Sequence, residues 1–335
     1  MKKQLVNLIS RTNVMRIVLV FVFALGAVSC NEKDDMPEMP VNPESKDLAY
    51  VLDNFEASFI AGMSEEDFLK KGKKVPTFKT LVTALVKTKL ISTVAKEQLT
   101  IFAPSDEAFA QLGLNAGNIG DVPNLKEILL YHAVEGKVYS NMLSNKFVAT
   151  LNGAAVQINV DNGVKVNDAN VLYANIRALN GVIHIVDKVL LPPTKNLVEV
   201  ALANAPEFSI LVAAVQKAGL AGTLSTGGPY TVFAPTNSAF VALLGELNAT
   251  SLDDISVEAL TKVLLYHVVN NRVYSSDLST GAVTTLNGTF NINVSTLKIT
   301  DSKGREAGLV PTLLNVQATN GVIHVIDRVI LPANL

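Results

Sequence analysis

An almost identical stretch of strand-like sequence occurs twice in this chain of 335 residues. Asn180–Pro193 reads NGVIHIVDKVLLPP, and Asn320–Ala333 reads NGVIHVIDRVILPA. Nine of the first thirteen positions are identical, and the other four exchange Ile with Val, Lys with Arg or Leu with Ile. This pattern indicates duplication of a folded unit, so a role proposed for the histidine of one segment has to hold for the histidine of the other.

Three further segments repeat in the same order, about 130 to 140 residues apart, which is far longer than the repeats of 20 to 50 residues that build solenoids. The chain is therefore predicted to contain two copies of one domain, and its length allows each copy a core of its own. The paired segments are TFKTLVTALVKTKL from Thr77 and EFSILVAAVQKAGL from Glu207, TIFAPSDEAF from Thr100 and TVFAPTNSAF from Thr231, and LLYHAVEGKVYSNML from Leu129 and LLYHVVNNRVYSSDL from Leu264.

Each copy begins with helical patterns and ends with strand patterns. Apolar residues from Phe78 to Leu85, and from Phe208 to Val215, recur at the spacing of one helix face. Ser105 and Thr236 follow FAP and are expected to cap the next helix. The second half of each copy has β-branched runs separated by Asn-Gly turns. Helices first and strands afterwards indicate an α+β domain.

The first thirty residues are typical of an export signal. Lysines and arginines precede the eleven-residue apolar run Ile17–Ala27, which is too short for a membrane span of about 20 residues. The run leads through small residues to Cys30, the only cysteine. This arrangement resembles a bacterial lipoprotein signal, although Ala27 stands where such signals usually have Leu. We expect residues 1–29 to be removed and Cys30 to carry lipid; the alternative is a plain secretory peptide followed by a chance cysteine.

Residues 30–45 are polar, acidic and rich in proline, which is typical of an extended tether. Within them Lys33-Asp34-Asp35 resembles the acidic signal that sends Bacteroidetes lipoproteins to the outer cell surface. We therefore expect an outer-membrane protein that is anchored by lipid and exposed on the cell surface. The first domain is predicted at 46–193, with a charged, helical start before Pro76, and the second at 194–335.

The segments TVFAPTNSAF, LLYHVV and NGVIHVIDRVILP resemble the three hallmark segments of the fasciclin (FAS1) family, and both copies carry all three in order. The resemblance implies two tandem FAS1-like domains of the α+β class, each a β-sandwich wedge flanked by helices. It also implies a role in adhesion or extracellular interaction, with no enzymatic activity and no cofactor. In animal relatives the Tyr-His segment has been proposed to bind integrins, which makes Tyr131, His132, Tyr266 and His267 candidate partner-binding residues.

All four histidines lie in the paired segments. The helical spacing puts His132 and His267 on the core side of a last helix turn, where a ring N–H can satisfy a free carbonyl. The alternation along the strand that contains His184 makes both of its faces mostly apolar, as in a strand covered on both sides. It also places His184 and Asp187 on opposite faces. The same holds for His324 and Asp327. We interpret the histidine and the aspartate of each repeated segment as buried structural groups with fixed partners: His184, Asp187, His324 and Asp327.

Catalysis is not indicated by the sequence. It has no G-x-S-x-G, Walker, GxGxxG or HExxH motif, and the four histidines lack the clustered spacing of a zinc site. The net charge of −2 gives no basic surface for nucleic acid. We therefore predict no enzyme, no metal and no cofactor.

The predicted function is that of a surface-anchored adhesion or interaction lipoprotein, with the membrane as one partner and an extracellular protein or glycan as the other. The alternative is a glycan-binding accessory lipoprotein of an outer-membrane polysaccharide uptake system. The chain has no Trp, the best platform for sugars, so Tyr139 and Tyr274 are the aromatic residues that could take that role.

Overall fold

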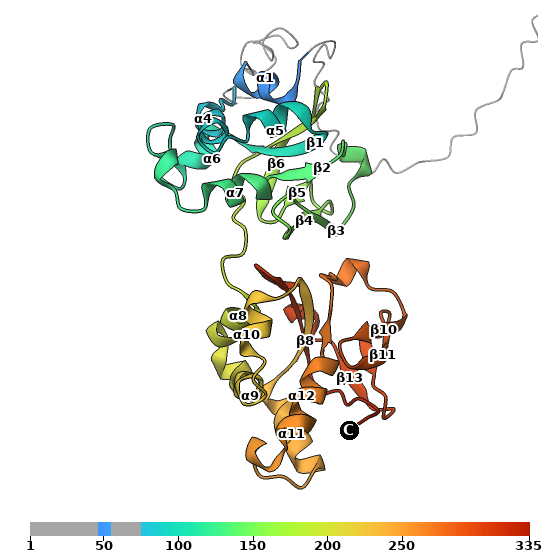
Figure 1. Ribbon diagram of the computed structural model, residues 1–335. Helices are drawn as coiled ribbons and strands as arrows, with labels where there is room; N and C mark the ends of the chain where they lie inside the picture. The colour runs from blue at the N-terminus through green and yellow to red at the C-terminus, as the bar shows by residue number, and fades with distance from the viewer. Residues whose placement is uncertain (1–45, 55–74) are drawn as a thin grey trace, which may run out of the picture. The chain divides into compact units, whose positions relative to one another are not determined.

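The computed structural model of the protein describes residues 46–54 and 75–335. The predicted signal, Cys30, the tether and most of the charged segment before Pro76 lie outside the described residues. Both copies place most of their helices in the first half and most of their strands in the second, with one strand between the helices, so the predicted α+β class is confirmed (Figure 1). Among the helices of the described part, none is both long and apolar enough to cross a bilayer.

The first domain packs its helices against one end of a seven-stranded sheet with the order β2-β1-β7-β6-β5-β4-β3. Strands β1 and β7 run parallel, and the other neighbours are antiparallel. Its helices are α1 (Leu48–Asp53), α4 (Lys79–Lys87), α5 (Ile91–Lys96), α6 (Asp106–Ala110) and α7 (Leu125–Tyr131), with 3-10 turns η1 (Ile119–Asp121) and η2 (Ser140–Met142). Its strands are β1 (Leu99–Pro104), β2 (Ala133–Glu135), β3 (Lys146–Ala149), β4 (Ala155–Asn159), β5 (Lys165–Val166), β6 (Ala169–Ala178) and β7 (Gly181–Val186).

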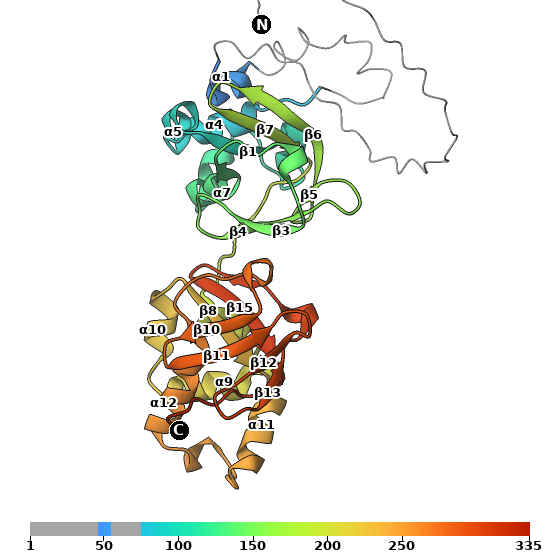
Figure 2. The same ribbon diagram turned by 90° about the vertical axis from the view of Figure 1, so that its right-hand side faces the viewer.

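The second domain repeats this arrangement with its sheet divided into β14-β15-β8-β9 and β10-β11-β12-β13. Figure 2 looks onto the second of these sheets. The helices are α8 (Leu197–Ala203), α9 (Ala205–Lys217), α10 (Ala221–Thr226), α11 (Asn237–Glu246) and α12 (Val257–Tyr266), with 3-10 turns η3 (Leu252–Asp254), η4 (Ser275–Asp277) and η5 (Pro311–Leu313). The strands are β8 (Tyr230–Pro235), β9 (Val268–Val269), β10 (Gly281–Thr285), β11 (Gly288–Asn293), β12 (Lys298–Thr300), β13 (Glu306–Gly308), β14 (Val316–Ala318) and β15 (Gly321–Ile326).

The two sheets of the second domain correspond to the two ends of the single sheet in the first. In the first domain β6 is long enough to pair with both β5 and β7, and its register against β7 shifts at two places. In the second domain η5 interrupts this strand, which leaves β13 and β14 as separate pieces. Bulges and breaks of this kind let a strand bend from one sheet into another. The predicted β-sandwich wedge is built in this way.

The paired central strands are covered on both sides, as their sequence predicts. Every residue of β7 and of β15 is buried. On one face Ile183 and Ile185 belong to the core shared with the helices. On the other face Val186 packs with Phe102 and with the strands β4 to β6. In Figure 1 helices α8 to α10 lie on one side of β8 and strands β10, β11 and β13 on the other.

Hydroxyl groups begin the helices that follow the FAP segments. The Oγ of Ser105 accepts from the backbone N–H of Ala108 at 3.3 Å, and the Oγ1 of Thr236 accepts from that of Ala239 at 3.2 Å. Both bonds satisfy one of the amides that a helix leaves free in its first turn. The predicted caps are confirmed in both copies.

Candidate functional site

His132 directly follows the last residue of α7, and its ring lies inside the first domain with the residue 2% exposed. Its Nδ1 lies 2.8 Å from the backbone oxygen of Ile128, and its Nε2 lies 2.8 Å from the backbone nitrogen of Leu190. A carbonyl only accepts and an amide only donates, so Nδ1 carries the proton and Nε2 accepts. The ring is therefore neutral, and the predicted bond from a ring N–H to a free helix carbonyl is present.

His267 repeats this arrangement after α12. Its Nδ1 donates to the backbone oxygen of Val263 at 2.7 Å, and its Nε2 accepts from the backbone N–H of Ile330 at 3.1 Å. Burial lowers the pKa of His267 and of His132 to about 4, and the bond to the helix carbonyl opposes this shift only in part. A charged ring would have to be desolvated and would lose its accepting nitrogen. Both rings are therefore held neutral at physiological pH.

His184, in the middle of β7, is fully buried and has the opposite tautomer. Its Nε2 donates to the backbone oxygen of Val138 at 2.9 Å, and its Nδ1 accepts from the backbone N–H of Asn175 at 3.5 Å. The ring stacks on Phe102 with 5.7 Å between centroids. Burial lowers the pKa of His184, which favours the neutral ring.

His324 has the same partners in the second domain. Its Nε2 donates to the backbone oxygen of Val273 at 2.9 Å, and its Nδ1 accepts from the backbone N–H of Asn315 at 3.3 Å. Asn175 and Asn315 adopt the left-handed conformation, with φ of 63° and 60°, which Asn tolerates better than most residues. Sequence reasoning missed both asparagines, although each lies nine positions before its histidine.

The asparagine that opens the repeated segment ties together parts of the domain that are distant in sequence. In the first copy the Oδ1 of Asn180 accepts from the backbone N–H of Leu48 at 2.9 Å. Its Nδ2 donates to the backbone oxygens of Val94 at 2.8 Å and of Glu97 at 2.7 Å. One side chain thus fixes the start of α1, the last turn of α5 and the turn before β7.

Asn320 has the corresponding role in the second domain, and we expect Asn320→Ala to destabilise that domain by about 2 to 3 kcal/mol. The side chain accepts from Leu197 N–H at 2.9 Å and donates to the oxygens of Leu224 at 2.9 Å and of Gly227 at 2.7 Å. Removing it leaves these groups without their partner. Urea unfolding measures the change, and a loss below about 0.5 kcal/mol would contradict this role.

The glycine of the repeated segment is required by a close approach of two strands. A Cβ atom on Gly181 would lie 2.0 Å from the backbone oxygen of Leu99, and one on Gly321 would lie 2.4 Å from that of Tyr230. Both oxygens belong to the region where the parallel neighbour strand begins. Only glycine allows this spacing, because the backbone cannot move aside without breaking the pairing.

Asp187 and Asp327 differ from the expectation that they are buried. Asp187 is half-buried and Asp327 is exposed, because each lies just beyond the end of its strand. Their roles are nevertheless structural. The carboxylate of Asp187 accepts from the backbone N–H and from the side chain of Asn170 at 2.7 and 2.6 Å, and that of Asp327 accepts from Gly308 N–H at 2.6 Å.

The Tyr-His pairs, predicted as candidate partner-binding residues, are turned inward in the structure. Tyr131 is 2% exposed and Tyr266 is fully buried, and the histidine next to each is 2% exposed. The hydroxyl of Tyr131 donates to the oxygen of Ala155 at 2.8 Å, and that of Tyr266 donates to the oxygen of Thr289 at 2.8 Å. Because their polar atoms are used inside the domain, His132 and His267 with their tyrosines offer no surface to a partner in this structure.

The two tyrosines considered for sugar binding do not form an open platform. Tyr139 is half-buried, and the guanidinium of Arg177 lies over its ring at 5.5 Å from the centroid. Tyr274 is buried, and its hydroxyl donates to the side-chain oxygen of Gln317 at 2.8 Å. A sugar that stacks on a ring needs an open face.

The chemistry open to the histidines is limited by these bonds. A general base or a metal ligand needs a ring nitrogen with a free lone pair, and in all four rings one nitrogen donates and the other accepts from a backbone amide. Within residues 46–54 and 75–335 no three side chains of His, Cys, Asp or Glu come together as a metal site. In the same ranges every buried polar side-chain atom has a hydrogen-bond partner. The four histidine rings therefore contribute to packing through bonds to the backbone.

The chain matches a known protein family over most of its described length. The family model described as the Fasciclin domain matches residues 76–192 and 206–332. Protein sll1483 of Synechocystis is 43% identical over 137 residues, which cover 41% of this chain and 73% of that protein. The transforming growth factor-beta-induced protein ig-h3 of Sus scrofa is 34% identical over 248 residues, which cover 70% of this chain and 34% of that protein.

Human periostin is 31% identical over 254 residues, which cover 71% of this chain and 29% of periostin. The chain therefore spans about a third of the length of these two animal relatives. Among solved structures, a FAS1 domain pair from the insect cell adhesion molecule Fasciclin I matches with a TM-score of 0.37 and 19% identity. That match covers 81% of this chain and 99% of the solved one.

Proposed function

Because the chain belongs to the fasciclin family, we propose that it is a non-enzymatic interaction protein held at the cell surface by a lipid on Cys30. Fasciclin domains typically occur in proteins of cell adhesion or of the extracellular matrix, and the family is generally non-enzymatic. The observation that carries the proposal is that all four imidazole rings have both nitrogens bonded to the backbone. The proposed interaction therefore does not use the histidine rings.

The anchor is supported by the sequence before the first domain. The apolar run Ile17–Ala27 and the small residues before Cys30 are typical of a lipoprotein signal. Buried acyl chains contribute about 0.8 kcal/mol per methylene, so more than one chain on Cys30 would hold the protein firmly. Lys33-Asp34-Asp35 supports export to the outer surface of the outer membrane.

We expect Cys30→Ala to release the protein from membranes, because this variant has no thiol for acylation. Fractionation of cells expressing the natural and altered chains measures the effect, and protease treatment of intact cells reports surface exposure of the natural chain. Membrane retention of the Cys30→Ala chain equal to that of the natural chain would contradict the lipid anchor. Full protection from protease would contradict surface exposure.

The partner is proposed to be an extracellular protein. The states of Tyr139 and Tyr274 argue against the alternative of glycan capture, because Tyr274 is buried and the half-buried ring of Tyr139 has the guanidinium of Arg177 over it. A pull-down with the soluble fragment from Ser45 onward, against matrix proteins in one arm and a glycan panel in the other, tests this. Saturable protein binding is expected. Saturable sugar binding that is lost in Tyr139→Ala would overturn it in favour of a glycan-binding accessory of polysaccharide uptake.

A further inference from the structure

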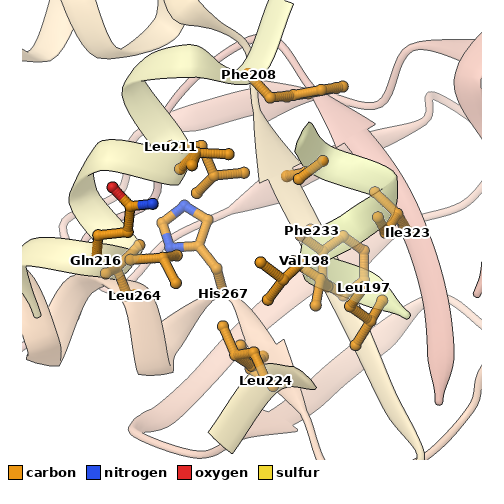
Figure 3. Close-up of a pocket in the computed structure, with 16 residues that line it drawn as sticks. Leu197, Val198, Phe208, Leu211, Gln216, Leu224, Phe233, Leu264, His267 and Ile323 are labelled. Atoms are coloured by element: carbon orange, nitrogen blue, oxygen red, sulfur yellow. The ribbon is translucent and has the colours of Figure 1, made fainter. Parts of the chain in front are cut away.

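A small apolar cavity lies in the second domain between helices α8, α9 and α10 and strand β8 (Figure 3). Its volume is about 50 Å³. Figure 3 shows Phe208 and Leu224 at opposite ends of the cavity, and Leu211 on the far side from Leu197. The cavity is part of the apolar core between the helices and the sheet, and its rim is the edge marked by the exposed Gln216 on α9.

Only two polar side chains line this cavity, and they differ in what they can offer. Both ring nitrogens of His267 are bonded to the backbone, so the ring presents carbon and hydrogen to the cavity. Gln216 is exposed at the rim, where its carboxamide can both donate and accept. The interior therefore suits a hydrocarbon group, and the rim suits a neighbouring peptide group.

The first copy shows what the second lacks at this place. Leu48 and Leu197 are equivalent, because each begins its helix and donates its N–H to the first asparagine of the repeated segment. Four positions later, on the same helix face, the first copy has Leu52 and the second has Ala201. Leu52 is 2% exposed and belongs to the core of its domain, whereas Ala201 is half-buried and lines the cavity.

Two further exchanges mark the same site. Val198 replaces the smaller Ala49, yet the cavity remains and Val198 lines it. Gln216 stands where the first copy has Val86, which is 57% exposed. The second copy thus combines a missing aliphatic side chain inside with an added amide at the rim.

We propose that the second domain binds a polypeptide partner by taking one leucine-sized aliphatic side chain of that partner into this cavity. The size of the inserted side chain follows from Leu52, the equivalent of Ala201 in the first copy. Its side chain is larger than that of Ala201 by an isopropyl group. The rim amide of Gln216 then pairs with the partner's backbone next to the inserted side chain. This cavity would be the place where the second domain contacts its protein partner. The proposal rests on the interaction function proposed above.

The test uses N-acetylleucinamide as the probe, with N-acetylalaninamide as its matched control. Hydrogen exchange, measured by mass spectrometry on the full chain in lipid nanodiscs, reports each domain separately. N-acetylleucinamide should slow exchange in residues 197–226 saturably, with an affinity at least about tenfold above that of N-acetylalaninamide, since burying a leucine side chain contributes about 1.5 kcal/mol or more. Residues 48–54 and 79–96 of the first domain should not respond.

Two reciprocal variants locate the effect. Ala201→Leu should abolish the response in the second domain, because its own side chain fills the cavity. Leu52→Ala should create a response in residues 48–54 and 79–96 of the first domain. Unchanged hydrogen exchange in α11 would show that Ala201→Leu leaves the fold intact. If Ala201→Leu disturbs the fold, Ala201→Val, with its smaller side chain, takes its place.

The proposal is overturned if N-acetylleucinamide leaves exchange in residues 197–226 unchanged, or if it slows exchange equally in the natural chain and in folded Ala201→Leu. The site and the wider interaction function fail separately. A protein partner still captured by Ala201→Leu, together with no response to N-acetylleucinamide, rejects the cavity and leaves the interaction function in place. If Ala201→Leu no longer captures the protein partner, and N-acetylleucinamide slows exchange in the natural chain, the result supports both the cavity site and the interaction function.

Discussion

Lowering the pH from 7 to 4 is expected to reduce the free energy of unfolding of each fasciclin domain by about 3 kcal/mol through a single histidine. The responsible residues are His132 in the first domain and His267 in the second, whose pKa values burial lowers to about 4. An unfolded histidine titrates near 6.5. Between these two values the unfolded chain binds a proton that the folded chain does not, so stability falls as the pH falls.

The stabilisation is complete above about pH 6.5 and decreases down to pH 4, which sets the window for the measurement. Burial also lowers the pKa of His184 and of His324, which adds to the loss in the same direction. Urea unfolding at several pH values, followed by hydrogen exchange in each domain, measures how the free energy of unfolding changes with pH. The control is His267→Gln, because an amide does not titrate. In this variant the stability of the second domain should depend much less on pH, while that of the first domain should keep its pH dependence. Equal stability of the natural chain at pH 7 and pH 5 would contradict the buried neutral rings.

Replacing His267 by alanine is expected to destabilise the second domain by about 4 kcal/mol at pH 7. The change removes a buried ring and leaves the Val263 oxygen and the Ile330 N–H without their hydrogen-bond partner. Each unsatisfied buried group costs about 1 to 3 kcal/mol, and the empty space adds to this. Urea unfolding gives the difference from the natural chain.

Val241→Ala is the matched control for this substitution, because Val241 lies on the same domain and is 61% exposed. Its effect should stay within about 0.5 kcal/mol. If His267→Ala changes stability no more than Val241→Ala does, the ring is not a structural element and is available for other chemistry.

Much of the fold could be predicted because its signals are local and occur twice. Helix periodicity, the capping residues Ser105 and Thr236, and strand alternation each depend on neighbouring positions. The duplication then showed which features are not accidental, and it pointed to His184 and His324 as core residues. Their places in β7 and β15 agree with that reading.

What sequence could not predict depends on contacts between distant segments. Nothing local indicates that Asn175 turns into the left-handed region and donates its N–H to the ring of His184. The exposure of Asp327 depends on where β15 ends. The exchange of Leu52 for Ala201 became visible only when hydrogen bonds fixed the equivalence of α1 and α8.

The imidazole rings can be observed directly by ¹⁵N NMR, which reports for each ring which nitrogen carries the proton and at what pH it titrates. We predict that His132 and His267 are protonated at Nδ1 and that His184 and His324 are protonated at Nε2. None of the four should titrate near 6.5 while the domains remain folded. A ring that titrates reversibly near 6.5 in the folded protein, or that exchanges between tautomers, would contradict the account of four histidines fixed as architecture.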